Sequence, residues 1–183
     1  MTGADDQRSR QSQQVGQSQQ VGQFRQFRPG VRLGVDVGSV RIGVAASDPG
    51  AVLAAPVETV QRGDDRASTR DDLRRIAALV VERGAIEVVV GLPLSMNGTR
   101  GTAAQAALEY ARAIAATVAP VPVRVVDERL STVTAHGQLG SVGVRSRARR
   151  EIVDQAAAVI ILQSALDAER SSGRAPGELV TAP

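Results

Sequence analysis

The sequence lacks residue types that several common kinds of site require. Its 183 residues include no cysteine and a single histidine. Without cysteine the chain forms neither disulfides nor thiolate metal sites, and one histidine argues against a zinc site. No apolar run reaches the length of a membrane span, and the first residues lack the apolar region of a signal peptide. We therefore expect a cytoplasmic protein with no membrane partner.

Lysine is also absent, so all 22 basic residues are arginine, while the formal net charge is only +3. Codon bias in a GC-rich genome explains a chain rich in alanine, valine and arginine. The functional alternative is phosphate recognition, because guanidinium groups donate paired hydrogen bonds to phosphate oxygens. Aromatic residues make up only 2% of the chain, so no stacking platform distinguishes an RNA from a DNA partner.

Composition divides the chain into three regions. Residues 1–30 are polar and Gln-rich, with QSQQVG occurring twice, and we predict a disordered arm there. The arm ends in QFRQFR, which either stacks on the bases of single-stranded nucleic acid or is a lineage-specific tail. The chain length suits one domain. We place that domain at 31–170 and a flexible C-terminal tail at 171–183.

Hydrophobic patterning predicts an α/β domain. Pro56 favours an edge position for the third strand, and Gly84 is a suitable end for the first helix. The predicted order is strands 31–37, 42–47 and 52–60, helix 68–82, strand 86–91, helix 102–118, strand 123–126, and a closing helix at about 147–168. This order resembles a ribonuclease-H-like domain: a mixed five-stranded sheet with helices on both faces.

Three acidic residues occur at the ends of apolar strands or near the start of an apolar helix. They are Asp36 in GVDVGSVRIGVA, Glu128 in VVDERLST and Asp154 in REIVDQAAAVIIL. An α/β sheet gathers functional groups at one edge, and partly buried carboxylates require a positive partner such as a divalent cation. Two Mg²⁺ or Mn²⁺ ions about 3.5–4 Å apart activate water and stabilise the leaving oxygen in phosphodiester hydrolysis. We therefore predict these three residues as catalytic and metal-binding.

Each acid also has a simpler interpretation. Asp36 precedes a glycine and could be an ordinary turn residue, although Gly43 in the next strand suggests close approach of another segment. Asp127 and Glu128 alternate in direction along their strand. We favour Glu128 as the ligand and leave Asp127 as structural or supporting.

Asp154 could simply pair with Arg150 at i, i+4 spacing. We expect the buried stripe of its helix to run through Val153, Ala156, Ala157, Ile160 and Ile161. The small alanines in that stripe favour a helix that lies close to the sheet and brings Asp154 towards Asp36.

Two arginine-containing segments suit a nucleic-acid substrate. The loop GLPLSMNGTRG opens a helix, where free N–H groups can receive a phosphate. The run GVRSRARRE places basic residues just before Asp154. The alternatives are an ordinary loop and a solvated charge run, and His136 is expected to be loosely packed. The predicted nucleic-acid-binding residues are Asn97, Arg100, Arg129, Arg145, Arg147, Arg149 and Arg150.

Four motifs together resemble the YqgF/RuvX family, which is similar in fold to the RuvC Holliday-junction resolvases. They are GVDVGSVRIGVAASD, VVVGLPLSMNGTRG, VDERLST and VDQAAAVIILQSAL, within residues 31–168. The resemblance implies a cytoplasmic, metal-dependent nuclease with Asp36, Glu128 and Asp154 at the family's acidic positions. It implies 5′-end maturation of pre-16S ribosomal RNA, with precursor ribosomal particles as partners. The alternative is resolution of Holliday junctions, whose paired cuts would require a homodimer.

Two other functions compete with this interpretation. An actin- or hexokinase-like phosphotransferase also begins with Asp-x-Gly, but it needs two such domains and this chain shows no second copy. A non-catalytic nucleic-acid-binding module on the same fold is the other alternative. The presence of all three acids argues against it.

Overall fold

The computed structural model describes residues 28–64, 70–95, 98–128 and 147–182. The strands form one mixed sheet in the order β3-β2-β1-β4-β5-β6, in which β1, β4 and β5 run parallel. The elements are β1 (Arg32–Val37), β2 (Arg41–Ser47), β3 (Ala54–Gln61), α2 (Asp71–Arg83), β4 (Glu87–Leu92), α3 (Thr102–Val118), β5 (Val123–Asp127), α5 (Arg147–Ser172) and β6 (Glu178–Val180).

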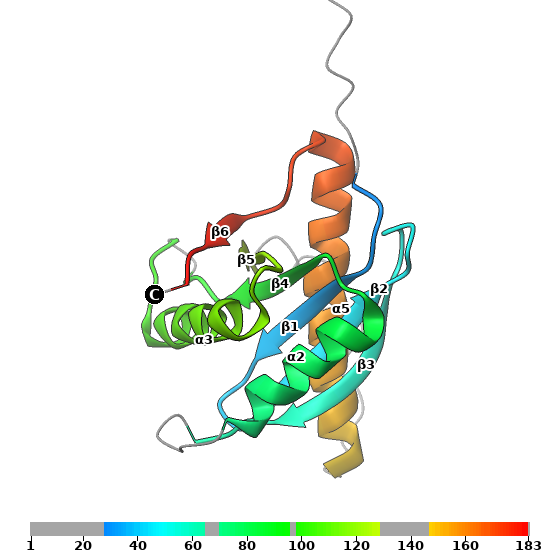
Figure 1. The fold of residues 1–183 in the computed structure, drawn as a ribbon. Helices are drawn as coiled ribbons and strands as arrows, with labels where there is room; N and C mark the ends of the chain where they lie inside the picture. Colours follow the sequence, from blue (N-terminus) through cyan, green and yellow to red (C-terminus); the bar gives the residue numbers. More distant parts are fainter. Residues whose placement is uncertain (1–27, 65–69, 96–97, 129–146, 183) are drawn as a thin grey trace, which may run out of the picture.

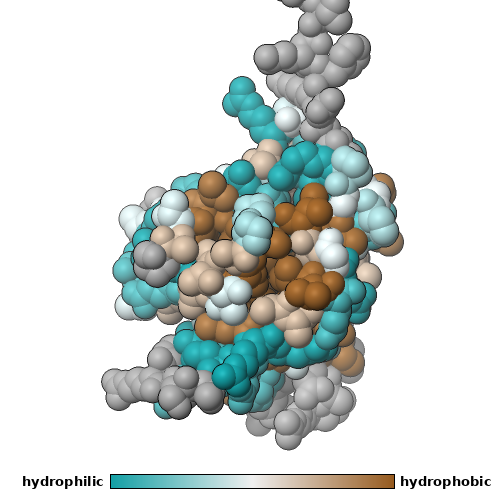
Figure 2. Space-filling model, viewed as in Figure 1, coloured by the Kyte–Doolittle hydropathy of each residue, from teal (hydrophilic) through white to brown (hydrophobic). Residues whose placement is uncertain are grey.

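Helices cover both faces of the sheet, as predicted. Helices α2 and α3 lie on one face and α5 on the other (Figure 1). Leu33 and Val35 of β1 pack with α2 and α3, whereas Val89 of β4 packs with α5. From the side of α2 and α3, apolar residues gather near the centre of the surface and hydrophilic ones surround them (Figure 2). Among the described residues, no helix is long and apolar enough to cross a membrane.

Two local predictions are confirmed. Strand β3, which contains Pro56, lies at the edge of the sheet, where a residue without an N–H group is tolerated. Helix α2 ends at Gly84, whose left-handed backbone (φ 58°) lets its N–H bond the last turn of the helix.

The sheet has six strands rather than the five predicted. The additional strand, β6, lies within the segment expected to be a flexible tail and pairs antiparallel with β5, with Val180 opposite Val123. It is only three residues long and mostly exposed. A strand this short carries no hydrophobic periodicity, so its partner strand rather than its own pattern determines it.

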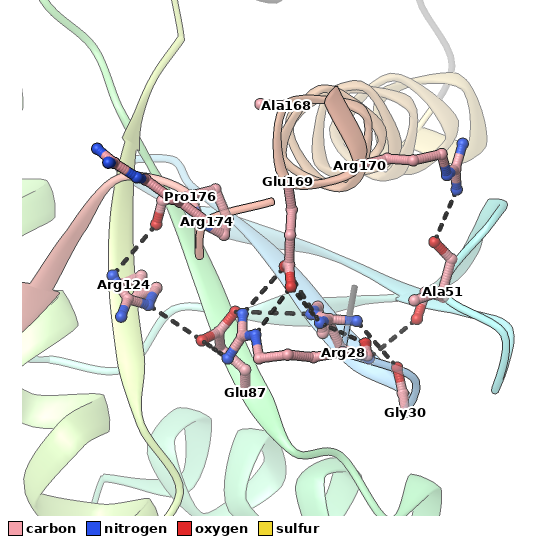
Figure 3. A network of polar contacts seen from close by, with 12 residues as sticks. Arg28, Gly30, Ala51, Glu87, Arg124, Ala168, Glu169, Arg170, Arg174 and Pro176 are labelled. Carbon is pink, nitrogen blue, oxygen red and sulfur yellow. Dashed lines mark hydrogen bonds and ion pairs between the residues drawn. The ribbon is translucent and has the colours of Figure 1, made fainter. Parts of the chain in front are cut away.

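One further expectation requires correction. The buried face of α5 runs through Ala158, Ile161, Leu162, Ala165 and Leu166, whereas Val153 from the expected stripe is 42% exposed. Arg28, which composition places in the Gln-rich arm, forms ion pairs with Glu87 and Glu169 (Figure 3). Tertiary contacts determine both features, and local composition does not reveal them.

Candidate active site

Asp36 lies near the carboxyl end of β1, on the face of the sheet that α5 covers. Its partner across the antiparallel β1–β2 pair is Gly43, and directly paired residues project from the same face. A Cβ atom on Gly43 would collide with the backbone carbonyl oxygen of Asp154 in α5. The glycine therefore lets α5 pack directly onto β2 at this point. The predicted close approach at Gly43 is confirmed, and it sets Asp154 beside Asp36.

Glu128 follows the last residue of β5, and its side chain reaches over β4. A Cβ atom on Gly91 of β4 would collide with Oε1 of Glu128 and would lie 2.6 Å from Cδ1 of Ile161 in α5. Gly91 pairs with Val126, two residues before Glu128, so these positions share the α5 face. The absence of a side chain at Gly91 thus gives Glu128 room on the same face as Asp36. The choice of Glu128 over Asp127 as the ligand stays a prediction.

The electrostatics of Asp36 and Glu128 disfavour their ionised forms. Burial, followed by repulsion from Asp154, raises the pKa of Asp36 to about 6. Burial, followed by repulsion from Asp36 and Asp127, raises the pKa of Glu128 to about 7. Asp36 therefore interacts with two other acids, Glu128 just after β5 and Asp154 in α5. Raised carboxyl pKa values in a partly buried cluster are typical of functional sites.

Asp154 is paired with an arginine. Nε of Arg41, the first residue of β2, donates to Oδ2 of Asp154 at 2.6 Å. Within residues 28–64, 70–95, 98–128 and 147–182, no three acidic or histidine side chains are grouped closely enough to hold one metal ion. The three-carboxylate metal site therefore stays a prediction.

The donor set nevertheless suits a hard divalent cation. Carboxylate oxygens are the ligands that Mg²⁺ and Mn²⁺ prefer. Asp36 and Glu128 lie on one face, and the charge of Asp36 raises the pKa of Glu128. A cation bound near both would favour their ionised forms. The residues therefore fit such a cation in the kind of ligand atom that they offer, and the charge of Asp154 is felt at Asp36.

A cavity of about 630 Å³ adjoins Glu128 on the α5 side of β5. Apolar side chains, including Leu92, Val126 and Ile161, make up much of its lining, and Asp127 and Glu128 also line it. Concave space beside functional carboxylates is where α/β proteins commonly bind ligands. Glu128 is therefore accessible from this cavity.

The predicted nucleic-acid-binding residues are only partly placed. Arg100 lines the same cavity and pairs with Glu178 at 2.8 Å. Arg147, Arg149 and Arg150 lie in the first turn of α5. Asn97, Arg129, Arg145 and His136 lie outside the described residues. The Phe/Arg pattern of the arm is also outside them except for Arg28, which is engaged in ion pairs.

Arg41 is the site residue that the sequence reasoning missed. It belongs to the motif GVDVGSVRIGVA, two residues before Gly43, and alternation along β2 places both on the α5 face. The sequence suggests Arg150 as a partner of Asp154, because their i, i+4 spacing is visible in it. The observed pair is separated by 113 residues. The sequence signal that could have identified Arg41 is its position two residues before Gly43, on the same face of β2.

Known proteins show the same architecture and sequence pattern. A family model described as "RuvX: Holliday junction resolvase" matches residues 30–168. A relative from Frankia casuarinae is 59% identical over 147 residues, covering 80% of this chain and 71% of the relative. Another, from Thermobifida fusca, is 56% identical over 160 residues, covering 84% of this chain and 97% of the relative. Both carry the name "Putative pre-16S rRNA nuclease".

A solved structure titled "T. thermophilus RuvC in complex with Holliday junction substrate" matches with a TM-score of 0.50 and 17% identity. The match covers 80% of this chain and 99% of that chain. At this identity the likeness concerns the fold. It confirms the predicted ribonuclease-H-like architecture.

Proposed function

Because this chain belongs to the RuvX family, we propose that it is a metal-dependent endonuclease that hydrolyses phosphodiester bonds in nucleic acid. Relatives that share more than half of the aligned residues are named for a nuclease, which supports this activity. Asp36, Glu128 and Asp154 are the proposed metal-binding and catalytic residues. Mg²⁺ or Mn²⁺ is the proposed cofactor.

One observation carries this proposal: Asp36 and Glu128, 92 positions apart in the sequence, share the α5 face at the carboxyl edge of the sheet. Their raised pKa values reflect the cost of placing negative charges together in a partly buried site. A purely structural role would not require this cost. A metal-binding role explains it, because a divalent cation compensates the charges.

The proposed roles follow from this arrangement. Bound Mg²⁺ or Mn²⁺ would supply an activated water and stabilise the developing charge of a phosphodiester under attack. Asp36 lies on β1, an interior strand of the sheet that is hydrogen-bonded to β2 and β4. Glu128 directly follows β5 and Asp154 belongs to α5, so the three proposed donors come from three separate segments of the chain.

The proposed substrate is the precursor of 16S ribosomal RNA, cut during maturation of its 5′ end. The names of the relatives support this choice. It would make precursor ribosomal particles the partners and the cytoplasm the place of action. The description of the family model supports the alternative, a branched DNA junction. Junction resolution would require two copies of the site and hence a homodimer.

A paired cleavage assay tests the function. Purified protein with Mg²⁺ or Mn²⁺ is given either a pre-16S transcript or a four-way DNA junction. We expect cleavage of the transcript that EDTA abolishes, and a roughly 1000-fold lower rate for Asp36→Asn, because metal-assisted charge stabilisation is worth several kcal/mol. Asp71→Asn, which changes an exposed acid of α2 paired with Arg74, is the matched control and should cleave normally.

The outcomes separate the competing functions. Cleavage of the junction alone would overturn the proposed substrate, and cleavage that persists in EDTA would overturn the mechanism. A non-catalytic module would bind nucleic acid without cutting it and would be insensitive to Asp36→Asn. Tight binding of ATP would instead favour a phosphotransferase.

A further inference from the structure

Arg41 lies at the candidate active site, where it is bonded to Asp154. As the first residue of β2, it projects from the same face as Gly43, against which the backbone of α5 packs at Asp154. Its bond to Asp154 joins β2 to α5 at the sheet edge that carries Asp36. The two side chains of the pair are 23% and 25% exposed. The pair is therefore reachable from solvent but partly screened from it.

Asp154 has an arginine as its partner within the candidate site. The pKa of Asp36 and Glu128 reflects burial and the charge of neighbouring acids, whereas Asp154 accepts a charge-assisted hydrogen bond from a guanidinium. Among the described residues no group of three acids is close enough to hold a metal. An arginine that holds one of the three provides a physical reason for this.

We propose that Arg41 is the counter-ion of Asp154 in the metal-free protein and gives up this carboxylate when a divalent cation binds. This inference rests on the proposed function, since it assumes that Asp154 becomes a metal ligand. Arg41 thereby acts as a positioning residue: it holds Asp154 until the cation replaces the guanidinium as its positive partner.

Two physical arguments support an exchangeable pair. The bond uses only Nε of Arg41, rather than the two parallel bonds that make arginine–carboxylate pairs strong. Partial exposure weakens the attraction further, because water screens the two charges. A divalent cation carries twice the charge of the guanidinium. Because both are positive, the cation and the guanidinium repel each other. Asp154 is therefore expected to change partners rather than keep both.

Metal affinity, measured without any nuclease assay, tests this proposal. Calorimetric titration of the full chain with Mn²⁺ should show about tenfold tighter binding for Arg41→Gln than for the wild type, because a competing positive charge has been removed. Arg75→Gln is the matched control. It removes the same charge from an arginine that is also paired with acids, but on α2, across the sheet. We expect it to change the affinity less than about twofold, since distant surface charges are screened.

A double-mutant cycle separates direct competition from general electrostatics. In an Asp154→Asn background, Arg41→Gln should tighten Mn²⁺ binding only about twofold, because the competed ligand is gone and only long-range repulsion remains. An equal gain in both backgrounds would overturn the proposal, and so would unchanged or weaker binding by Arg41→Gln. Circular dichroism of each variant verifies that it is folded.

The exchange itself can be observed by NMR. In the metal-free protein the Nε–H signal of Arg41, identified by its loss in Arg41→Lys, should be that of a hydrogen-bonded group. Saturating Mg²⁺ should shift it to the position of a solvent-exposed guanidinium, and an unmoved signal would contradict the proposal. If the wild type binds no Mn²⁺ or Mg²⁺ at all, the metal-dependent function fails as well. Binding with no effect of Arg41 overturns this inference alone.

Discussion

The two ends of the sheet hold partly buried charges in opposite ways. At the carboxyl end, Asp36 and Glu128 have raised pKa values because burial and neighbouring acids disfavour their charges. At the amino end, burial alone would raise the pKa of Glu169, but the hydrogen bond from Arg28 and the charges of Arg32 and Arg28 lower it. The ionised forms of Asp36 and Glu128 are therefore disfavoured at the first end, whereas arginines favour the ionised form of Glu169 at the second.

The amino end holds a network of three arginines and two glutamates (Figure 3). Arg32, Glu87 and Glu169 are at most 1% exposed. Arg28 donates to both oxygens of Glu87 at 3.0 and 2.9 Å and to both of Glu169 at 2.8 and 3.0 Å. Arg124 completes it with a bond to Glu87. The network joins the arm, β1, β4, β5 and α5, so this end serves the fold, whereas the carboxyl end is the one that we propose binds a ligand.

The largest expected effect is at the amino end. Glu87→Gln or Glu169→Gln should lower the free energy of unfolding by about 3–5 kcal/mol, because a buried arginine keeps its charge and loses a counter-ion. Asp36→Asn, at the other end, should leave stability unchanged or increase it, since it removes a disfavoured charge. Urea unfolding followed by circular dichroism measures both. Equal destabilisation by the glutamate variants and by Asp36→Asn would mean that the two ends do not differ in how their charges are compensated.

A second change tests how α5 meets the carboxyl end. Gly43→Ala should destabilise the protein by about 1–3 kcal/mol, because the added methyl group requires α5 to move away from β2 at Asp154. Gly101→Ala is the control, since a Cβ there meets no atom within 4 Å. Thermal unfolding compares the two variants, and a Gly43→Ala protein as stable as the wild type would refute the close packing.

The third prediction concerns pH in the absence of metal. The pKa of Asp36 rises from 3.8 to about 6 and that of Glu128 from 4.5 to about 7. Between about pH 4 and pH 7 the folded state therefore binds more protons than the unfolded chain, and the contribution of these two groups to stability falls as pH rises. After allowance for solvent screening, the loss should be about 1–2 kcal/mol.

Urea unfolding in EDTA at pH 5 and pH 7.5 measures this loss as the difference between the wild type and Asp36→Asn/Glu128→Gln. The double variant should lose less stability, or gain more, over the same interval. Identical pH dependence in the two proteins would show that these carboxyl groups are not perturbed.

The smallest expected effect belongs to an exposed pair. Arg100 and Glu178 are 43% and 70% exposed in their side chains, so Arg100→Ala should cost less than about 1 kcal/mol of stability. If Arg100 also contacts the substrate, the same variant should raise KM for nucleic acid. Unfolding and steady-state cleavage, measured on the same preparation, distinguish these effects. A KM equal to that of the wild type would remove Arg100 from the proposed interface.

Much of the fold could be predicted from sequence, because periodic apolar residues mark the strands and helices. Helix α3, for example, has the bounds expected from its pattern. Local sequence could also identify Asp36, Glu128 and Asp154 as candidates. It could not identify β6, whose three residues depend on β5, or the docking of Arg28. The Arg41–Asp154 pair was equally invisible, since it depends on how closely α5 packs onto Gly43.

The central claim is that the acids at the carboxyl end bind divalent metal. Titration of metal-free protein with Mn²⁺ tests it most directly, comparing the wild type with Glu128→Gln and with Glu178→Gln, an exposed acid that lines the same cavity. We predict binding by the wild type and Glu178→Gln, and at least tenfold weaker binding by Glu128→Gln, because a ligand carboxylate is lost. Equal affinity in all three proteins would contradict the claim.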